Sequence, residues 1–214
     1  MNKLGYKLTS LGWIPEDWEI KKIKDIGKIS SGTTPSRNIP EYHRDGEIYW
    51  VKTTDLNNSI IFNTEEKITH KALLETSLRI YPKGTVLVAM YGGFNQIGRT
   101  GCLSAPAATN QAISVLVVDN KFALPVYVLA WLNAKVEDWK RIASSSRKDP
   151  NITGSDVASF PISLPEIREQ RKIADNLTSL DELITAQTQK LDALNTHKKG
   201  MMQQLFPSPQ EVDA

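Results

Sequence analysis

Hydrophobic positions divide the chain into two stretches with different periodicity. Up to about residue 164, short apolar runs alternate with turn-forming residues, which is typical of strands joined by loops. The clearest predicted strands are 48–51, 85–90 and 112–118, and the best predicted helix in this stretch is 124–142. This mixture predicts an α+β fold built on a mixed or mainly antiparallel sheet.

After residue 164 the spacing becomes that of one long coiled-coil helix. Pro165 suits a first helical turn, and no further proline occurs before Pro207. Between these prolines, seam positions recur at alternating steps of four and three residues, and eight of the ten are apolar. The predicted seam is Ile173, Leu177, Leu180, Ile184, Gln187, Leu191, Leu194, Lys198, Met201 and Leu205.

A helix of this length needs a partner. Forty helical residues extend about 60 Å, which is more than a domain of this size can cover. The alternative is a helix that folds back on its own domain. The predicted organisation is therefore a globular domain at 1–164, a long helix at 165–206 for dimerisation and docking, and a disordered tail at 207–214.

Composition and charge narrow the class of protein. The chain has 214 residues, 40% of them hydrophobic, and its single cysteine, Cys102, excludes an internal disulfide and a cysteine-based zinc cluster. No signal peptide or membrane span is evident, so we expect a soluble, cytoplasmic protein without membrane contact. Residues 1–164 hold 20 basic and 16 acidic side chains, and 165–214 hold 6 and 8. The mildly basic first part permits nucleic-acid binding without requiring it.

A glycine-rich stretch at 93–100 differs at one position from the phosphate-binding pattern G-x-x-x-x-G-K-[ST]. Arg99 stands where that pattern requires lysine. The following residues include Pro106 and then a β-rich run, whereas a phosphate-binding loop must open into a helix. We therefore predict a glycine-rich loop with another role.

Patterns typical of catalysis and metal binding are weak. Acid-x-lysine fragments occur at 17–21 and 138–140, but such fragments are common by chance. The histidines, His43, His70 and His197, lack ligand-like spacing and are expected on the surface. There is no nucleophile elbow and no methyltransferase motif. We predict a binding protein without a catalytic or metal site.

Three polar loops carry side chains suited to nucleic acid. They lie at 31–38, 91–101 and 144–151. Amide side chains can pair with adenine edges, and arginine can bind guanine or phosphate. Glycines also allow the backbone to approach a ligand closely.

The order of motifs resembles the DNA-specificity (S) subunit of type I restriction–modification enzymes. The residues that carry this resemblance cover almost the whole chain: Leu11-Gly-Trp-Ile-Pro-Glu-Asp-Trp-Glu-Ile-Lys-Lys-Ile23, Ile29-Ser-Ser-Gly-Thr-Thr-Pro35, Ile48-Tyr-Trp-Val-Lys-Thr-Thr-Asp-Leu56, Ala108-Thr-Asn-Gln-Ala-Ile113, the junction from Ile152 to Ile173, and Leu180-Asp-Glu-Leu-Ile184.

The resemblance implies a function. Domains of this family read one half of a bipartite site in double-stranded DNA, and the long helix acts as a spacer and docking rod. Modification (methyltransferase) subunits bind to it and carry S-adenosylmethionine, and restriction subunits contribute ATP- and Mg-dependent cleavage. No cofactor is expected in this chain. Our DNA-binding candidates are Arg37, Tyr91, Asn95, Gln96, Arg99, Arg147 and Lys148.

The chain departs from the family in having one recognition domain and one helix instead of two of each. We therefore expect a homodimer through antiparallel long helices, which would rebuild the usual arrangement. The alternatives are a coiled-coil adaptor that binds protein without DNA, and a small nuclease that uses an acid-x-lysine fragment.

Overall fold

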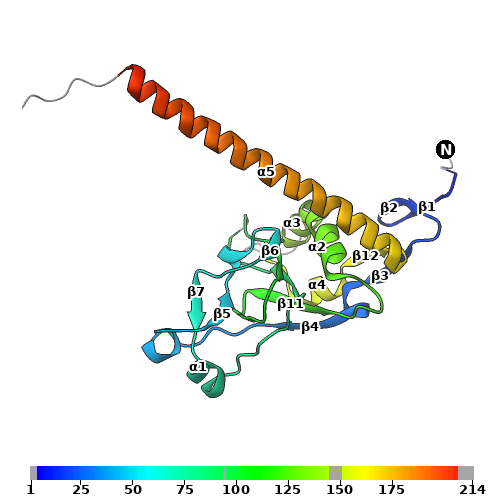
Figure 1. The fold of residues 1–214 in the computed structure, drawn as a ribbon. Coiled ribbons are helices and arrows are strands. Elements are labelled where there is room, and N and C mark those ends of the chain that lie inside the picture. Colours follow the sequence, from blue (N-terminus) through cyan, green and yellow to red (C-terminus); the bar gives the residue numbers. More distant parts are fainter. Residues whose placement is uncertain (1–3, 94, 145–150, 207–214) are drawn as a thin grey trace, which may run out of the picture. The chain divides into compact units, whose positions relative to one another are not determined.

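The computed structural model describes residues 4–93, 95–144 and 151–206 (Figure 1). The chain forms two compact units, Met1–Lys172 and Ile173–Ala214. The long helix α5 (Ile167–Leu205) begins in the first unit, so the division between the units falls inside the helix. Among the described residues, no helix combines the length and the apolarity that a membrane crossing requires.

The centre of the first unit is a mixed five-stranded sheet. Its strand order is β4 (Gly27–Ser31), β11 (Ile113–Val118), β8 (Val86–Ala89), β9 (Thr100–Leu103) and β6 (Ser59–Ile61). Only the β6–β9 pair is parallel within this sheet. Every residue of β8 is buried, which explains why its sequence is a continuous apolar run.

A smaller three-stranded sheet supports one side of the unit. It has the order β10 (Ala108–Thr109), β5 (Ile48–Val51) and β7 (Glu66–Ile68), with β10 parallel to β5. Trp50 lies in a compact apolar cluster that includes Ile68 and Tyr42, the latter from η2 (Pro40–Tyr42). The same cluster includes Ala72 of α1 (His70–Glu75).

The two ends of the first unit meet in a second pair of strands. The hairpin β1 (Tyr6–Thr9) and β2 (Gly12–Pro15) leads into β3 (Glu19–Lys22), which pairs antiparallel with β12 (Pro161–Leu164). Next to this pair, α4 (Gly154–Ser159) packs against η1 (Ile23–Asp25). The segment before the long helix is thus hydrogen-bonded to the start of the chain (Figure 1).

The predicted fold class is confirmed: an α+β fold with a mixed sheet and a long C-terminal helix. The strands predicted at 48–51, 85–90 and 112–118 correspond to β5, β8 and β11. The single helix predicted at 124–142 is wrong, because α2 (Pro125–Ala134) and α3 (Val136–Ser144) are separate. Lys135 leaves helical geometry between them, with φ −112° and ψ 20°, and donates its backbone N–H to Leu132 instead.

Gln170 fixes the first turn of α5 within the first unit. Its side chain is fully buried, and its amide oxygen accepts a hydrogen bond from the backbone N–H of Leu124 at 2.9 Å. Its amide nitrogen donates to the carbonyls of Phe122, at 3.1 Å, and Pro165, at 2.9 Å. One glutamine therefore satisfies three backbone groups where the chain enters α2 and α5.

Gln170→Ala is expected to lower the free energy of unfolding by about 3 kcal/mol, since buried backbone groups left without partners are costly. Denaturant unfolding followed by tryptophan fluorescence at a fixed protein concentration measures this change. Gln189→Ala, at an exposed position of α5, is the matched control and should have little effect. Equal stability of the two variants would contradict the role of Gln170.

Candidate nucleic-acid interface

The glycine-rich loop after β8 is closed at its base by backbone hydrogen bonds. Ala89 donates to the carbonyl of Arg99 at 2.8 Å, and Gly98 donates back to that of Ala89 at 3.0 Å. Met90 donates to Ala112 at 2.8 Å, at the start of β11. The loop thus projects from a rigid point between neighbouring strands, which is where adaptable recognition residues are commonly placed.

Side chains within this loop divide into an anchor and exposed groups. Ile97 is buried and holds the loop to the core, whereas Tyr91 and Asn95 are exposed. Gln96 and Arg99 are half-buried, and the side-chain oxygen of Gln96 is enclosed without a hydrogen-bond partner in the structure. The structure therefore brings four of the predicted DNA-binding residues together in one loop.

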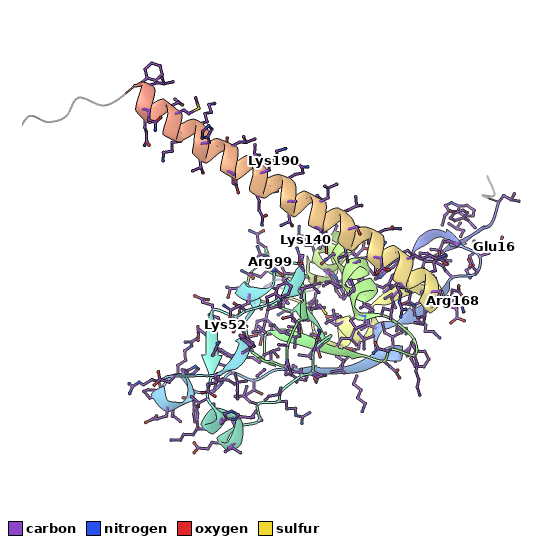
Figure 2. All side chains as sticks on the ribbon, in the orientation of Figure 1. Glu16, Lys52, Arg99, Lys140, Arg168 and Lys190 are labelled. Atoms are coloured by element: carbon purple, nitrogen blue, oxygen red, sulfur yellow. The ribbon has the colours of Figure 1, made fainter. Side chains whose placement is uncertain are left out.

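Helix α3 packs against the far end of the same loop. A Cβ at Gly98 would lie 2.8 Å from the Cβ of Trp139, whose ring stacks on Phe160 at a centroid distance of 3.7 Å. Figure 2 labels Arg99 and Lys140, which directly follow Gly98 and Trp139 in the sequence. Close packing of α3 therefore depends on the glycine at position 98.

Arg147 and Lys148, in the third predicted loop, lie outside the described residues. Before them, α3 contacts the glycine-rich loop where Trp139 meets Gly98. After them, Ile152 donates its backbone N–H to Met90 at 2.9 Å.

A short helical turn, η3 (Thr53–Asp55), borders the loop on another side. A Cβ at Gly92 would lie 3.2 Å from the Thr53 hydroxyl oxygen. Lys52 precedes this turn, and its ammonium forms ion pairs with Glu65, at 2.8 Å, and Glu66, at 2.6 Å (Figure 2). Lys52 was not among the residues that the sequence singled out for this surface, although it stands within a motif that carried the family resemblance.

Arg37 belongs to this ion-pair network and not to the glycine-rich loop. Its guanidinium lies 3.0 Å from the Glu66 carboxylate and 5.8 Å from the centre of the Trp50 ring. Burial disfavours charge on Glu66, but hydrogen bonds from Arg37 and Lys52 outweigh it and lower the pKa of this carboxyl. Arg37 is thereby held in one orientation at an exposed position.

Three of the motifs that carried the resemblance pack on one another as a framework. A Cβ at Gly32 would meet the backbone and hydroxyl oxygens of Thr109 at 2.1 Å, so no other residue fits. Thr33 donates its backbone N–H to Thr109 at 2.9 Å and accepts a bond from the Trp50 indole at 3.2 Å. A hydrogen bond also joins Thr34 to Gln111. These motifs position the loops.

The loop leads directly into β9, as the rejection of a phosphate-binding loop predicted, and not into a helix. Acidic side chains of both acid-x-lysine fragments form local ion pairs. Glu19 pairs with Lys21 at 3.1 Å, and Asp138 pairs with Arg141 at 3.0 Å. Over the described ranges, no group of three or more His, Cys, Asp or Glu side chains is arranged to hold a metal ion.

The expected surface position is wrong for His43. This residue is half-buried, with both ring nitrogens enclosed, and its ring lies edge-on to Trp50 at a centroid distance of 5.9 Å. His70 and His197 are exposed, as predicted. The aromatic packing around Trp50 accounts for the difference, because η2 brings His43 against that cluster.

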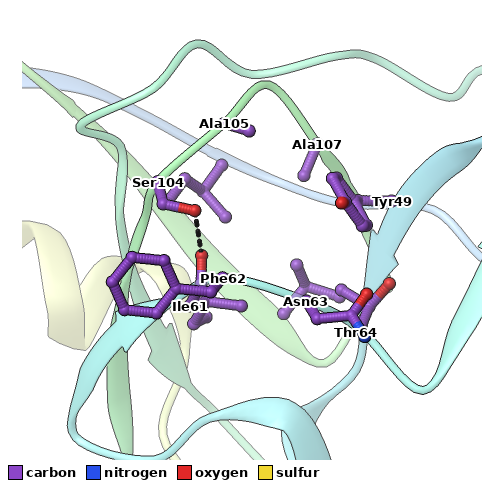
Figure 3. Close-up of a pocket in the computed structure, with 10 residues that line it drawn as sticks. Tyr49, Ile61, Phe62, Asn63, Thr64, Ser104, Ala105 and Ala107 are labelled. Carbon is purple, nitrogen blue, oxygen red and sulfur yellow. Dashed lines mark hydrogen bonds between the residues drawn. The ribbon is translucent and has the colours of Figure 1, made fainter.

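A small hollow between β5, β6 and β9 is the pocket in Figure 3. Tyr49, Ile61 and Ala107 are among its lining residues, and the Ser104 hydroxyl donates to the Ile61 carbonyl at 2.6 Å. Its free volume of about 10 Å³ is at the lower limit for a single water molecule. The hollow is too small for a cofactor or a nucleotide.

The geometry defines a recognition unit: polar loops on a rigid framework, continued by a helix with an exposed apolar seam. Residues 15–196 match the family described as the type I restriction modification DNA specificity domain, and the chain belongs to this family.

One curated relative supports the family, and one solved structure shares the fold. The MjaIX specificity subunit of Methanocaldococcus jannaschii is 38% identical over 183 residues, which are 84% of this chain and 41% of that subunit. The HsdS subunit of Thermoanaerobacter tengcongensis has a TM-score of 0.62 at 13% identity, over 87% of this chain and 42% of that one.

A further solved chain has the same fold. It comes from a structure of complex assembly and conformational transition of the type I R-M system, with a TM-score of 0.68 and 15% identity. The match covers 89% of this chain and 45% of that one. This chain therefore spans a little under half the length of the relatives it matches.

Gly98→Ala is expected to destabilise the loop and the α3 contact, lowering the free energy of unfolding by about 2–3 kcal/mol. The cause is double: φ at Gly98 is +75°, and the new methyl group would clash with Trp139. Gly154→Ala, where a Cβ meets open space, is the control. Denaturant unfolding that showed no difference between the two variants would contradict this packing.

Proposed function

We propose that this chain is a DNA-specificity subunit that reads one half of a bipartite site and docks modification (methyltransferase) subunits. The observation that carries the proposal is the glycine-rich loop, whose exposed polar side chains project from a framework built by motifs of the specificity family. Such a framework allows the reading residues to vary while the backbone that presents them stays fixed.

The loop side chains suit base and phosphate contacts. Asn95 and Gln96 can pair with the two hydrogen-bonding positions of an adenine edge, and Arg99 can bind guanine or a backbone phosphate. The Gln96 side-chain oxygen is enclosed without a partner in the structure, so pairing with a base requires this side chain to turn outward. Arg37, whose guanidinium uses one nitrogen for Glu66, retains donors for a second contact at its exposed side.

The catalytic chemistry belongs, in this proposal, to other subunits. S-adenosylmethionine would be bound by the modification subunits, and ATP with Mg²⁺ by restriction subunits that associate indirectly. This chain would contribute sequence selection and a docking surface in the cytoplasm. A homodimer through antiparallel α5 helices would supply two recognition units and a site with two-fold symmetry.

Arg99→Ala is expected to weaken binding to the preferred duplex by about 1–3 kcal/mol if Arg99 reads a base, with relaxed preference at one position. If Arg99 binds phosphate, all sequences should weaken alike and the salt dependence should become shallower. The preferred duplex is first selected from a randomised duplex library, with a modification subunit present, and affinity is then measured by fluorescence anisotropy.

Lys83→Ala is the matched control, because it removes one exposed positive charge from the opposite end of β8. Unchanged affinity and unchanged preference in Arg99→Ala would refute the role of the loop. Failure of the wild-type protein to enrich any sequence would favour an adaptor that binds only protein.

Ile184→Asp is expected to convert a dimer into a monomer, since it places a charge at an apolar seam position. Sedimentation equilibrium at micromolar concentration should give twice the chain mass for the wild type and one chain mass for the variant. Thr196→Asp, at an exposed position outside the seam, should remain dimeric. A monomeric wild type would count against the homodimer.

A further inference from the structure

The seam of α5 is exposed along nearly all of its length. Its apolar members beyond Ile173 are 42% to 66% exposed, namely Leu177, Leu180, Ile184, Leu191, Leu194, Met201 and Leu205. Gln187 and Lys198 complete the seam and are also exposed. Such a narrow, continuous stripe fits another helix with the same spacing.

We infer that a second copy of this chain covers the seam in one antiparallel register, with the two-fold axis at Gln189. This inference rests on the proposed homodimer and specifies which residues meet in it. Gln189 itself lies outside the seam, midway between the first and last seam positions, Ile173 and Leu205.

Full coverage of the seam selects this register. In an antiparallel pair, each residue and its counterpart lie at equal distances on either side of the axis. With the axis at Gln189, all ten seam positions find seam partners. The pairs are Ile173 with the partner's Leu205, Leu177 with the partner's Met201, Leu180 with the partner's Lys198, Ile184 with the partner's Leu194, and Gln187 with the partner's Leu191.

Neighbouring registers leave seam positions without seam partners. A shift of one heptad moves the axis to between Thr185 and Ala186, and Met201 then faces Gln170, whose amide is already engaged in three hydrogen bonds. The opposite shift places the counterparts of Ile173 and Leu177 beyond Leu205, where α5 ends. Both shifts reduce the apolar area that the pair can bury.

Charge supports the same arrangement. Lys198 lies opposite the partner's Leu180, and Asp181 directly follows Leu180 in the sequence. The lysine stem can therefore pack in the seam while its ammonium approaches the partner's Asp181. A parallel pair in register would instead place Lys198 against the partner's Lys198, which is repulsive.

Distances between spin labels at two threonines test the register. Thr178 and Thr196 are exposed and lie outside the seam on α5, so Thr178→Cys and Thr196→Cys leave its apolar residues intact. Native Cys102 is 3% exposed, and burial raises the pKa of its thiol to about 11, so it should stay unlabelled. The wild-type chain treated with the same label is the control.

With the axis at Gln189, the two labels at Thr178→Cys are offset along the helices by about 33 Å, and those at Thr196→Cys by about 21 Å. Double electron–electron resonance should therefore give the longer distance at Thr178→Cys. With the axis between Thr185 and Ala186 the order reverses, at about 23 Å and about 32 Å. A parallel pair in register gives no axial offset at either position.

A longer distance at Thr178→Cys supports the inference, and the reversed order or equal distances overturn the register while leaving a homodimer intact. Sedimentation of both variants is measured alongside. A single-chain mass for the wild type would overturn the proposed homodimer itself, and the register with it.

Discussion

The recognition unit depends on how its two ends are joined. Antiparallel pairing of β3 with β12 connects residues about 140 positions apart, and Gln170 completes the junction from the first turn of α5. Without the bonds from Gln170, the backbone groups of Phe122, Leu124 and Pro165 would lose these partners at the point where the sheet unit becomes a helix. Trp18 adds a link of the same kind, because its indole donates to the Glu169 carboxylate at 3.3 Å. The helix therefore begins as a part of the folded unit and not as a flexible extension.

Recognition and support are separated within that unit. Thr109 leaves no room for a Cβ at Gly32, and the Trp50 indole is hydrogen-bonded to the adjacent Thr33, so this region has little freedom to vary. The described part of the loop from Tyr91 to Arg99 is instead held at its base, at Ile97 and where Gly98 meets Trp139, while Tyr91 and Asn95 stay exposed. A change of exposed side chain there costs little stability, because it disturbs neither the framework nor the core. This separation allows one fold to present different side chains in the loop.

Sequence periodicity predicted the elements whose burial is simple. Strand β8 is apolar throughout because both of its faces are covered, and β11 is apolar except for the buried Ser114. Helix α5, of 39 residues, carries its seam from Ile173 to Leu205. Strands β6 (Ser-Ile-Ile), β7 (Glu-Lys-Ile) and β9 (Thr-Gly-Cys-Leu) were missed because polar residues or glycine interrupt them, whereas β5 and β8 are continuous apolar runs. The break at Lys135 could not be predicted either, because no proline or glycine marks it in the sequence. For the site, the loop was found from its glycines and polar residues, but the pairing of Arg37 and Lys52 with Glu66 depends on tertiary contacts.

The two polar seam positions connect stability with the choice of partner. Apolar residues in place of Gln187 and Lys198 would bury more apolar surface in a helix pair. Such a uniform stripe, however, would accept several registers and orientations of a second helix. A lysine in the seam destabilises any helix pair that buries its ammonium without a carboxylate nearby. A glutamine destabilises any pair that leaves its buried amide without a hydrogen-bond partner. Of the two, Lys198 discriminates more strongly, since an unpaired charge costs more to bury than an amide. In the proposed homodimer such discrimination would matter for function, because the register of the helices would set the separation between the two recognition units.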